Sequence, residues 1–150
     1  MALKNALLLL VAVCVLAAGC AKPEEKYIGQ YTGKLEFSPG AQARLERMSG
    51  QPGALKAVMD QMKMTLDLRK DMSYTMSATV MGKATSATGT WAYKDDKLTL
   101  TPAQATGPTG QQTPIGAGKT QAFTPSADGK TLTVERPGGN AEAKMIFTRN

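Results

Sequence analysis

Apolar and polar residues alternate along most of this chain, and this alternation is the feature that most restricts its fold. In one stretch Tyr31, Gly33 and Leu35 fall on the same face, with polar or charged residues between them. A period of two puts successive side chains on opposite faces of a strand, so each such stretch predicts a strand with one buried face. About eight short strands joined by turns predict a mainly β fold, an antiparallel barrel or a highly curved sheet. The stretches are residues 27–37, 62–68, 72–80, 85–93, 97–101, 120–124, 132–134 and 143–147.

Two segments interrupt the alternation. Residues 38–61 are predicted to form two short helices, because Ser38-Pro39 is a helix start signal and Gly50 a stop signal. We expect this insertion to cover one end or one face of the barrel. Residues 102–118 are rich in Gly, Pro, Thr and Gln and predict a long loop. The second helix has an apolar stripe at helical spacing, made of Leu55, Val58, Met59 and Met62.

The N-terminus has the pattern of an export signal. An uncharged apolar run of thirteen residues, 6–18, follows Lys4. It has the length of a secretory signal core and is shorter than the ~20 residues needed to span a bilayer. Small residues close the run at Gly19, and Cys20 follows directly. The segment 16–20, Leu-Ala-Ala-Gly-Cys, resembles the lipobox of bacterial lipoproteins, in which the signal is cleaved just before a cysteine that receives a lipid.

This resemblance implies a signal peptide at 1–19, a lipidation site at Cys20 and a lipidated tether at 20–26. Acyl chains such as palmitate would then hold the protein on a membrane of the bacterial cell envelope. Residue 21 is Ala and not Asp, which by the sorting rule of enteric bacteria implies the outer membrane, facing the periplasm. The alternative is cleavage by the ordinary signal peptidase, which would leave Cys20 as a free N-terminal thiol.

Residues 27–150 are expected to form one domain. Several of its short motifs resemble the small lipocalin-like β-barrel domains of bacterial lipoproteins, although the Gly-x-Trp of true lipocalins is Gly-x-Tyr here. The resemblance implies a barrel that binds a small apolar ligand or an envelope protein. The Cys-x-x-Cys of the copper-responsive members is absent. The motifs are Gly-Gln-Tyr-Thr-Gly at 29–33, Gly-Thr-Trp at 89–91, Lys-Leu-Thr-Leu at 97–100, Asp-Gly-Lys-Thr-Leu at 128–132 and a terminal strand ending at Arg149.

Composition excludes several classes of function. The chain has no histidine, which removes Ser-His and Cys-His catalysis and the commonest metal ligand. Most of the aspartates fall in predicted turns, where their side chains hydrogen-bond to the local backbone. We therefore expect no catalytic residue, no enzyme activity and no cofactor. The net charge is +6, but no stretch of the chain alternates Lys or Arg with aromatic residues that could stack on bases, so we expect no nucleic-acid partner. The expected partner is the membrane, through the N-terminal lipid.

Two groups of residues are candidates for a binding site. Tyr31, Trp91 and Tyr93 could line a ligand cavity, and the alternative is that they fill the inside of the barrel. The spacing of Met59, Met62 and Met64 matches thioether motifs that hold Cu(I), although core packing is the simpler interpretation. The sequence thus favours a non-enzymatic envelope lipoprotein with a ligand or partner, and leaves open a structural or envelope-stress protein with a filled core.

Overall fold

The computed structural model describes residues 22–51, 53–115, 120–135 and 142–150. The predicted signal peptide and Cys20 lie outside these residues. The elements in chain order are η1 (Glu25–Tyr27), β1 (Gly29–Phe37), α2 (Pro39–Ser49), α3 (Ala54–Gln61), β2 (Lys63–Leu68), β3 (Ser73–Val80), β4 (Lys83–Lys94), β5 (Lys97–Thr106), β6 (Gln112–Pro114), β7 (Gln121–Pro125), β8 (Thr131–Glu135) and β9 (Ala143–Arg149).

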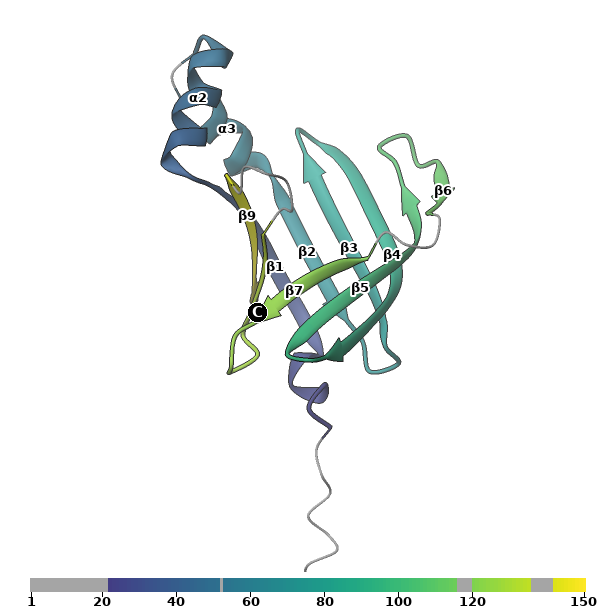
Figure 1. The fold of residues 1–150 in the computed structure, drawn as a ribbon. Coiled ribbons are helices and arrows are strands. Elements are labelled where there is room, and N and C mark those ends of the chain that lie inside the picture. The colour runs from purple at the N-terminus through teal and green to yellow at the C-terminus, as the bar shows by residue number, and fades with distance from the viewer. Residues whose placement is uncertain (1–21, 52, 116–119, 136–141) are drawn as a thin grey trace, which may run out of the picture.

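Eight antiparallel strands close into a barrel, which confirms the predicted mainly β fold (Figure 1). Going round the barrel, the order is β1, β2, β3, β4, β5, β7, β8 and β9, and β9 pairs with β1 to complete the ring. Each of the eight predicted strands corresponds to one of these. β6 is an additional strand that pairs with the last residues of β5.

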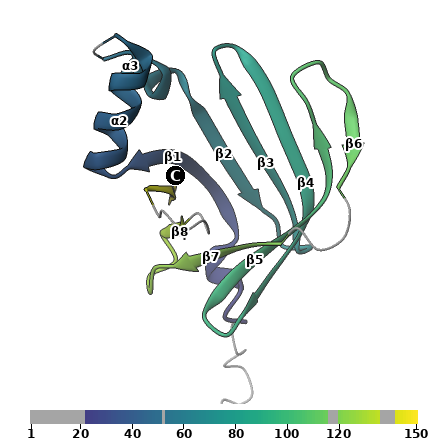
Figure 2. The ribbon, with the colours of Figure 1, turned by 45° about the horizontal axis from the view of Figure 1, so that its top comes forward.

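The two ends of the barrel differ. At the closed end lie η1 and the turns that join β2 to β3 and β4 to β5. At the open end lie the β3–β4 and β5–β6 turns and both helices, as the two ribbon views agree (Figures 1 and 2). We call the halves of the barrel next to these ends the packed half and the open half.

Large side chains fill the packed half. The ring centroids of Tyr27 and Tyr93 are 4.7 Å apart, and those of Phe123 and Phe147 are 5.8 Å apart in an edge-on arrangement. All thirteen residues of the core cluster lie between Tyr27 and Phe147. A chain that begins at Lys22 therefore contains all the core residues of the described part of the protein, and we expect it to fold. The other members of the cluster are Tyr31, Leu66, Leu68, Tyr74, Trp91, Leu98, Leu100, Leu132, Val134 and Met64, of which Met64 extends the cluster into the open half.

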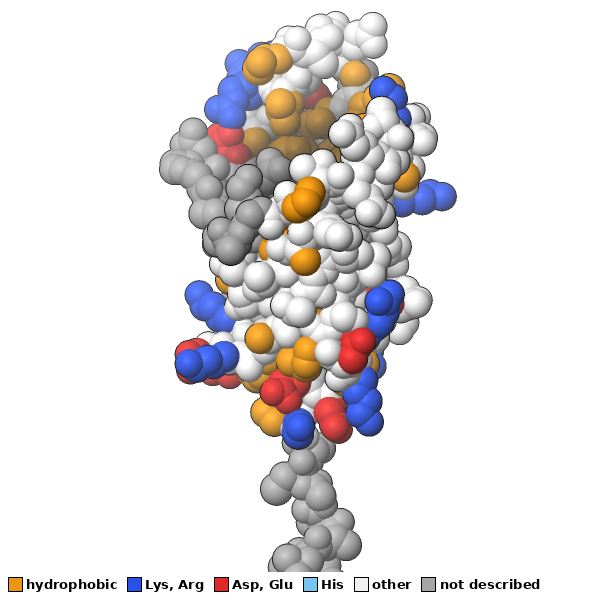
Figure 3. Space-filling view, turned by 90° about the vertical axis from the view of Figure 1, so that its right-hand side faces the viewer, with side chains coloured by type: hydrophobic (Ala, Val, Ile, Leu, Met, Phe, Trp, Pro, Cys, Tyr) orange, Lys and Arg blue, Asp and Glu red, His pale blue; other side chains and the backbone are white. Residues whose placement is uncertain are grey.

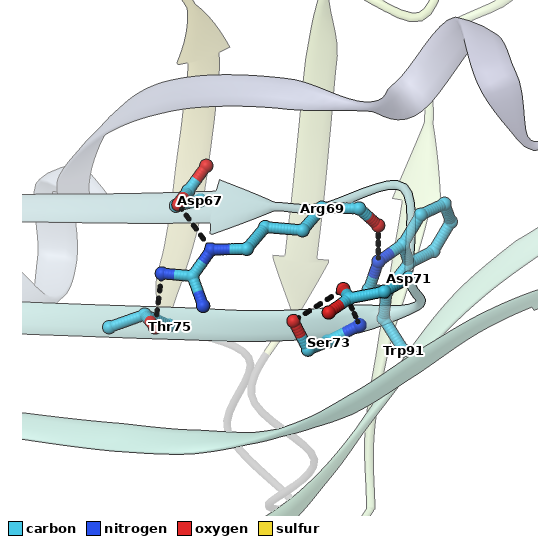
Figure 4. A network of polar contacts seen from close by, with 6 residues as sticks. All are labelled: Asp67, Arg69, Asp71, Ser73, Thr75 and Trp91. Atoms are coloured by element: carbon cyan, nitrogen blue, oxygen red, sulfur yellow. Dashed lines mark hydrogen bonds and ion pairs between the residues drawn. The ribbon is translucent and has the colours of Figure 1, made fainter.

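A polar network fixes the β2–β3 turn at the closed end (Figure 4). The indole nitrogen of Trp91 donates to the carbonyl of Arg69 at 3.0 Å, which ties β4 to the turn. The guanidinium of Arg69 contacts Asp67 at 3.0 Å and donates to the Thr75 hydroxyl at 3.1 Å. The Asp71 carboxylate accepts hydrogen bonds from the backbone and side chain of Ser73, and the latter bond holds the pKa of this carboxyl below its usual value. The turn is thus closed by side chains as well as backbone.

The helical insertion forms as predicted. The Ser38 side chain accepts a hydrogen bond from the amide of Ala41 at 3.2 Å, which caps the start of α2, and Gly50 ends the helix in a left-handed conformation. α2 contacts β1 and α3 contacts β3, so the helices flank the opening of the barrel (Figure 2). An ion pair joins Arg44 of α2 to Glu142, just before β9.

The segment 102–118 differs from the expected long loop. β5 continues to Thr106, and a turn leads back into β6. Pro102 lacks an amide hydrogen, but it pairs with Gly89 next to a shift of register at which Ala103 of β5 has no partner on β4, so the ladder of hydrogen bonds is already interrupted there. The strand therefore tolerates the proline and continues. In the turn between β3 and β4, Met81 and Gly82 both adopt a left-handed conformation.

Candidate functional site

The open half of the barrel contains a cavity of about 440 Å³. Figure 3 shows hydrophobic side chains inside a hollow near the top of the molecule, at the open end. We call this cavity the cup and define it by its apolar lining, to which Ser and Thr residues of β3 to β6 add a few polar atoms. The apolar lining is Met64, Met76, Met145, Ala78, Ala87 and Ala105.

The registers of the strands bring the three methionines to the inside of the barrel. Met64 of β2 lies between Gly33 of β1 and Ala78 of β3. Met76 and Met145 occupy inward positions on β3 and β9, and both are half-buried. Met64 itself is buried, with 7% of its surface exposed. The thioethers thus come from three different strands.

Small side chains leave the space that forms the cup. Ala87 of β4 pairs with Ala105 of β5, so two neighbouring inward positions carry only a methyl group. The same positions nearer the closed end carry Trp91 and Leu100, which pair with each other and are buried. A barrel of eight strands has an interior that side chains can just fill, so large residues close one half and small residues leave the other open.

The cup suits an uncharged apolar ligand. Among the described residues, no Asp, Glu, Lys or Arg side chain lines it. A charged ligand group inside would therefore be desolvated without a charged partner. Methionine side chains are flexible and polarizable, so they adapt to ligands of different shape. The lining is typical of a site that recognises apolar surface and not a particular polar group.

The structure places Tyr31, Trp91 and Tyr93 in the packed half, away from the cup. The Tyr31 hydroxyl donates to the carbonyls of Tyr27 at 2.8 Å and Gly129 at 3.1 Å, and burial raises the pKa of this phenol to about 12. Trp91 is buried, and Tyr93 is half-buried at the closed end. Their aromatic rings help to fill the packed half. The cup residues Met76 and Met145 were not singled out from the sequence, although their inward positions in the alternation and the alanines beside them could have indicated a cavity.

Met59, Met62 and Met64 come together around a second, smaller cavity. It has a volume of about 290 Å³ and lies between the end of α3 and β1. Two carboxylates line it, and both are held by ion pairs, Glu36 with Lys34 at 2.6 Å and Asp60 with Lys56 at 2.7 Å. The hydrogen bond from Lys34 is the main cause that lowers the pKa of Glu36. The cavity thus combines three thioethers with two carboxylates that already have ion-pair partners.

Within residues 22–51, 53–115, 120–135 and 142–150, His, Cys, Asp and Glu form no group of three or more that could hold a metal ion. No helix in these ranges is both long enough and apolar enough to cross a bilayer. No protein-family model matches the sequence, and no curated protein matches it.

Proposed function

We propose that this protein is a non-enzymatic lipoprotein of the bacterial envelope that holds a small apolar ligand in the cup. The observation that carries this proposal is the unequal filling of the barrel. Aromatic and leucine side chains close the packed half, whereas methionine and alanine line a cavity of about 440 Å³ in the open half. A protein that needed only a stable core would gain free energy by filling this space as well.

The proposed anchor is a lipid on Cys20. It is supported by the apolar run of thirteen residues and the lipobox-like segment that follows it. The described chain begins at Lys22 and reaches the barrel through η1 at the closed end. An anchor on residue 20 would hold the closed end towards the membrane, so that the cup opens away from it. A ligand could then enter or leave without passing the lipid surface.

Binding of a neutral apolar fluorescent dye, N-phenylnaphthylamine, to a chain of residues 22–150 tests the cup. We expect saturable binding, and we expect Ala87→Trp to weaken it about tenfold or more because the indole occupies the cavity. The matched control is Ala92→Trp, an exposed position on the same strand, which should leave the affinity unchanged. The proposal is overturned if the wild-type chain does not bind the dye, or if Ala87→Trp binds it as well as the wild type does.

Native mass spectrometry of the same chain, purified from its host under mild conditions, identifies any ligand that stays bound. A co-purifying apolar molecule that Ala87→Trp excludes would support the proposal and name its ligand. An envelope protein as the partner, or a purely structural role, would instead give a chain without a small molecule in any preparation.

Intact mass of the full-length protein, isolated from membranes of a bacterial host, tests the anchor. We expect a chain that begins at Cys20 and carries diacylglycerol and acyl groups, and we expect Cys20→Ser to lose this modification. An unmodified thiol at residue 20, or a chain that retains residues 1–19, would contradict the assignment. This result is independent of dye binding, so the proposal for the lipid anchor and the proposal for the cup are tested separately.

Cu(I) binding is a second candidate function, because Met59, Met62 and Met64 line one cavity. Soft thioether sulfur suits Cu(I), and the ion needs no charged ligand. Competition with a chromogenic Cu(I) chelator should show one bound ion, and Met62→Leu should abolish this binding, whereas Met48→Leu on the exposed face of α2 should not. If the protein takes no Cu(I) from the chelator, this candidate function is wrong.

A further inference from the structure

The methionines of this protein are gathered at the open end of the barrel. Of the eight that follow residue 22, all but Met72 lie on the helices, in the open half or at its rim. The aromatic residues have the opposite distribution, since all but Phe37 lie in the packed half or against its end. The large apolar side chains that line the cup are therefore methionines, whereas the packed half is filled mainly by aromatic rings and leucines.

We propose that Met64, Met76 and Met145 are sites of reversible oxidation, and that their oxidation to sulfoxide empties the cup. This inference rests on the proposed function, because it concerns the ligand of the same cavity. The oxidant is a two-electron oxidant of the hydroperoxide class. A lone pair on the methionine sulfur attacks the OH oxygen of the hydroperoxide, and the O–O bond breaks. The proton of this OH moves to the other peroxide oxygen, which departs as water or an alcohol. Sulfur is oxidised by two electrons and the peroxide is reduced by two.

The new sulfoxide changes the character of the lining. It converts a flexible apolar side chain into a polar one with a strong hydrogen-bond acceptor. Among the described lining residues no Lys or Arg is present to donate to this oxygen. The sulfoxide oxygen must therefore accept its hydrogen bonds from water or from the few Ser and Thr hydroxyl groups of the cup. An apolar ligand that displaces this water leaves a buried polar group unpaired, which weakens its binding.

Two further methionines provide an internal comparison. Met48 on α2 and Met81 in the β3–β4 turn are the exposed large hydrophobic residues of the described chain, at 78% and 68% exposure. Neither lines the cup. They should react first with peroxide and without effect on the ligand. The half-buried Met76 and Met145 should react next, and the buried Met64 last.

Stepwise oxidation tests the inference. The chain of residues 22–150 is treated with increasing hydrogen peroxide, and at each step peptide mass spectrometry gives the oxidised fraction of each methionine. Affinity for N-phenylnaphthylamine is measured on the same samples, and near-ultraviolet circular dichroism checks that the barrel stays folded. We expect no change of affinity while Met48 and Met81 react, then a loss of about tenfold or more as the three cup methionines react. Treatment with methionine sulfoxide reductases should restore the affinity.

Two variants separate the cup from the rest of the molecule. In Met64→Leu/Met76→Leu/Met145→Leu the cavity keeps its approximate volume and apolar character, so the chain should bind the dye and become insensitive to peroxide. Met48→Leu/Met81→Leu should remain as sensitive as the wild type. A folded chain that keeps its affinity with all three cup methionines oxidised would overturn this inference alone, and so would a leucine variant that still loses the dye on treatment. A wild-type chain that never binds the dye would overturn the proposed function itself.

Discussion

Individual glycines decide whether the strands of this barrel can approach one another. A Cβ added at Gly33 would lie 2.5 Å from the ring of Phe147, and one added at Gly89 would overlap the carbonyl oxygen of Thr101. Both positions are in the interior of strands, where glycine is otherwise unfavourable. Glycine is needed at both positions because neighbouring atoms occupy the space that a side chain would take.

Replacing Gly89 by alanine should destabilise the fold by about 2 kcal/mol or more, because the clash is with backbone that cannot rotate away. The free energy of unfolding in urea measures this. Gly40→Ala in α2 is the matched control, since a Cβ there meets nothing within 4 Å, and it should leave stability unchanged or raise it slightly. Equal effects of the two substitutions would contradict the close-packing explanation.

The phenol of Tyr31 makes stability depend on alkaline pH. Burial raises its pKa from 10 to about 12. Between these values the folded state keeps a proton that the unfolded state has lost, so raising the pH favours unfolding, by up to about 1.4 kcal/mol per pH unit from this group. Tyr31→Phe should cost about 1–3 kcal/mol near neutral pH, because two buried carbonyls lose their donor, and should give a shallower decline between pH 10 and 12. Urea unfolding at several pH values measures both, and an unchanged alkaline slope would contradict the assignment to Tyr31.

At the scale of the element, the β3–β4 hairpin has an unfavourable turn residue. Met81 adopts φ 50° and Gly82 φ 76°, as in a two-residue turn of type I′, where Asn or Gly usually takes the first position. The Met81→Asn substitution should therefore stabilise the protein by about 1 kcal/mol. Thermal unfolding checks this. The same substitution at Met48, which is exposed in a helix, should be mildly destabilising, so a similar gain at both positions would point to a cause other than the turn.

The strands were predictable because apolar and polar residues alternate along them. The helices were predictable because Ser38 and Gly50 are a start and a stop signal. The extent of β5 was not predictable in the same way, since Pro102 indicates the end of a strand unless the bulge beside it, at Ala103, is known. The cup escaped prediction for a related reason. Which inward positions lie at the same height depends on the pairing register, and the pairing of Met145 in β9 with Leu35 in β1 joins segments that are far apart in the sequence. Aromatic residues were the natural candidates for a cavity, but they fill the packed half.

The whole molecule should have two levels of local stability. The packed half is held by buried rings and leucines, whereas the walls of the cup surround unfilled space. Amides near Leu66, Leu100 and Phe147 should therefore exchange hydrogen only on global unfolding, and those near Ala78 and Ala105 considerably faster. Hydrogen exchange followed by mass spectrometry or NMR measures this. Added N-phenylnaphthylamine should slow exchange in both halves, because a ligand bound to the folded state also opposes global unfolding. Uniform protection of both halves without ligand would contradict this division.

The neighbouring position of the first and last strands also affects when the chain can fold. β1 pairs with β9 over seven residues, from Tyr31 with Arg149 to Phe37 with Ala143. The barrel cannot close until β9 has been synthesised, because β1 has no neighbour on that side before then. Pairing across almost the whole chain also makes closure slow. A chain that still lacks β9 therefore has β1 as an unpaired edge, and only the pairing of these two strands completes the ring.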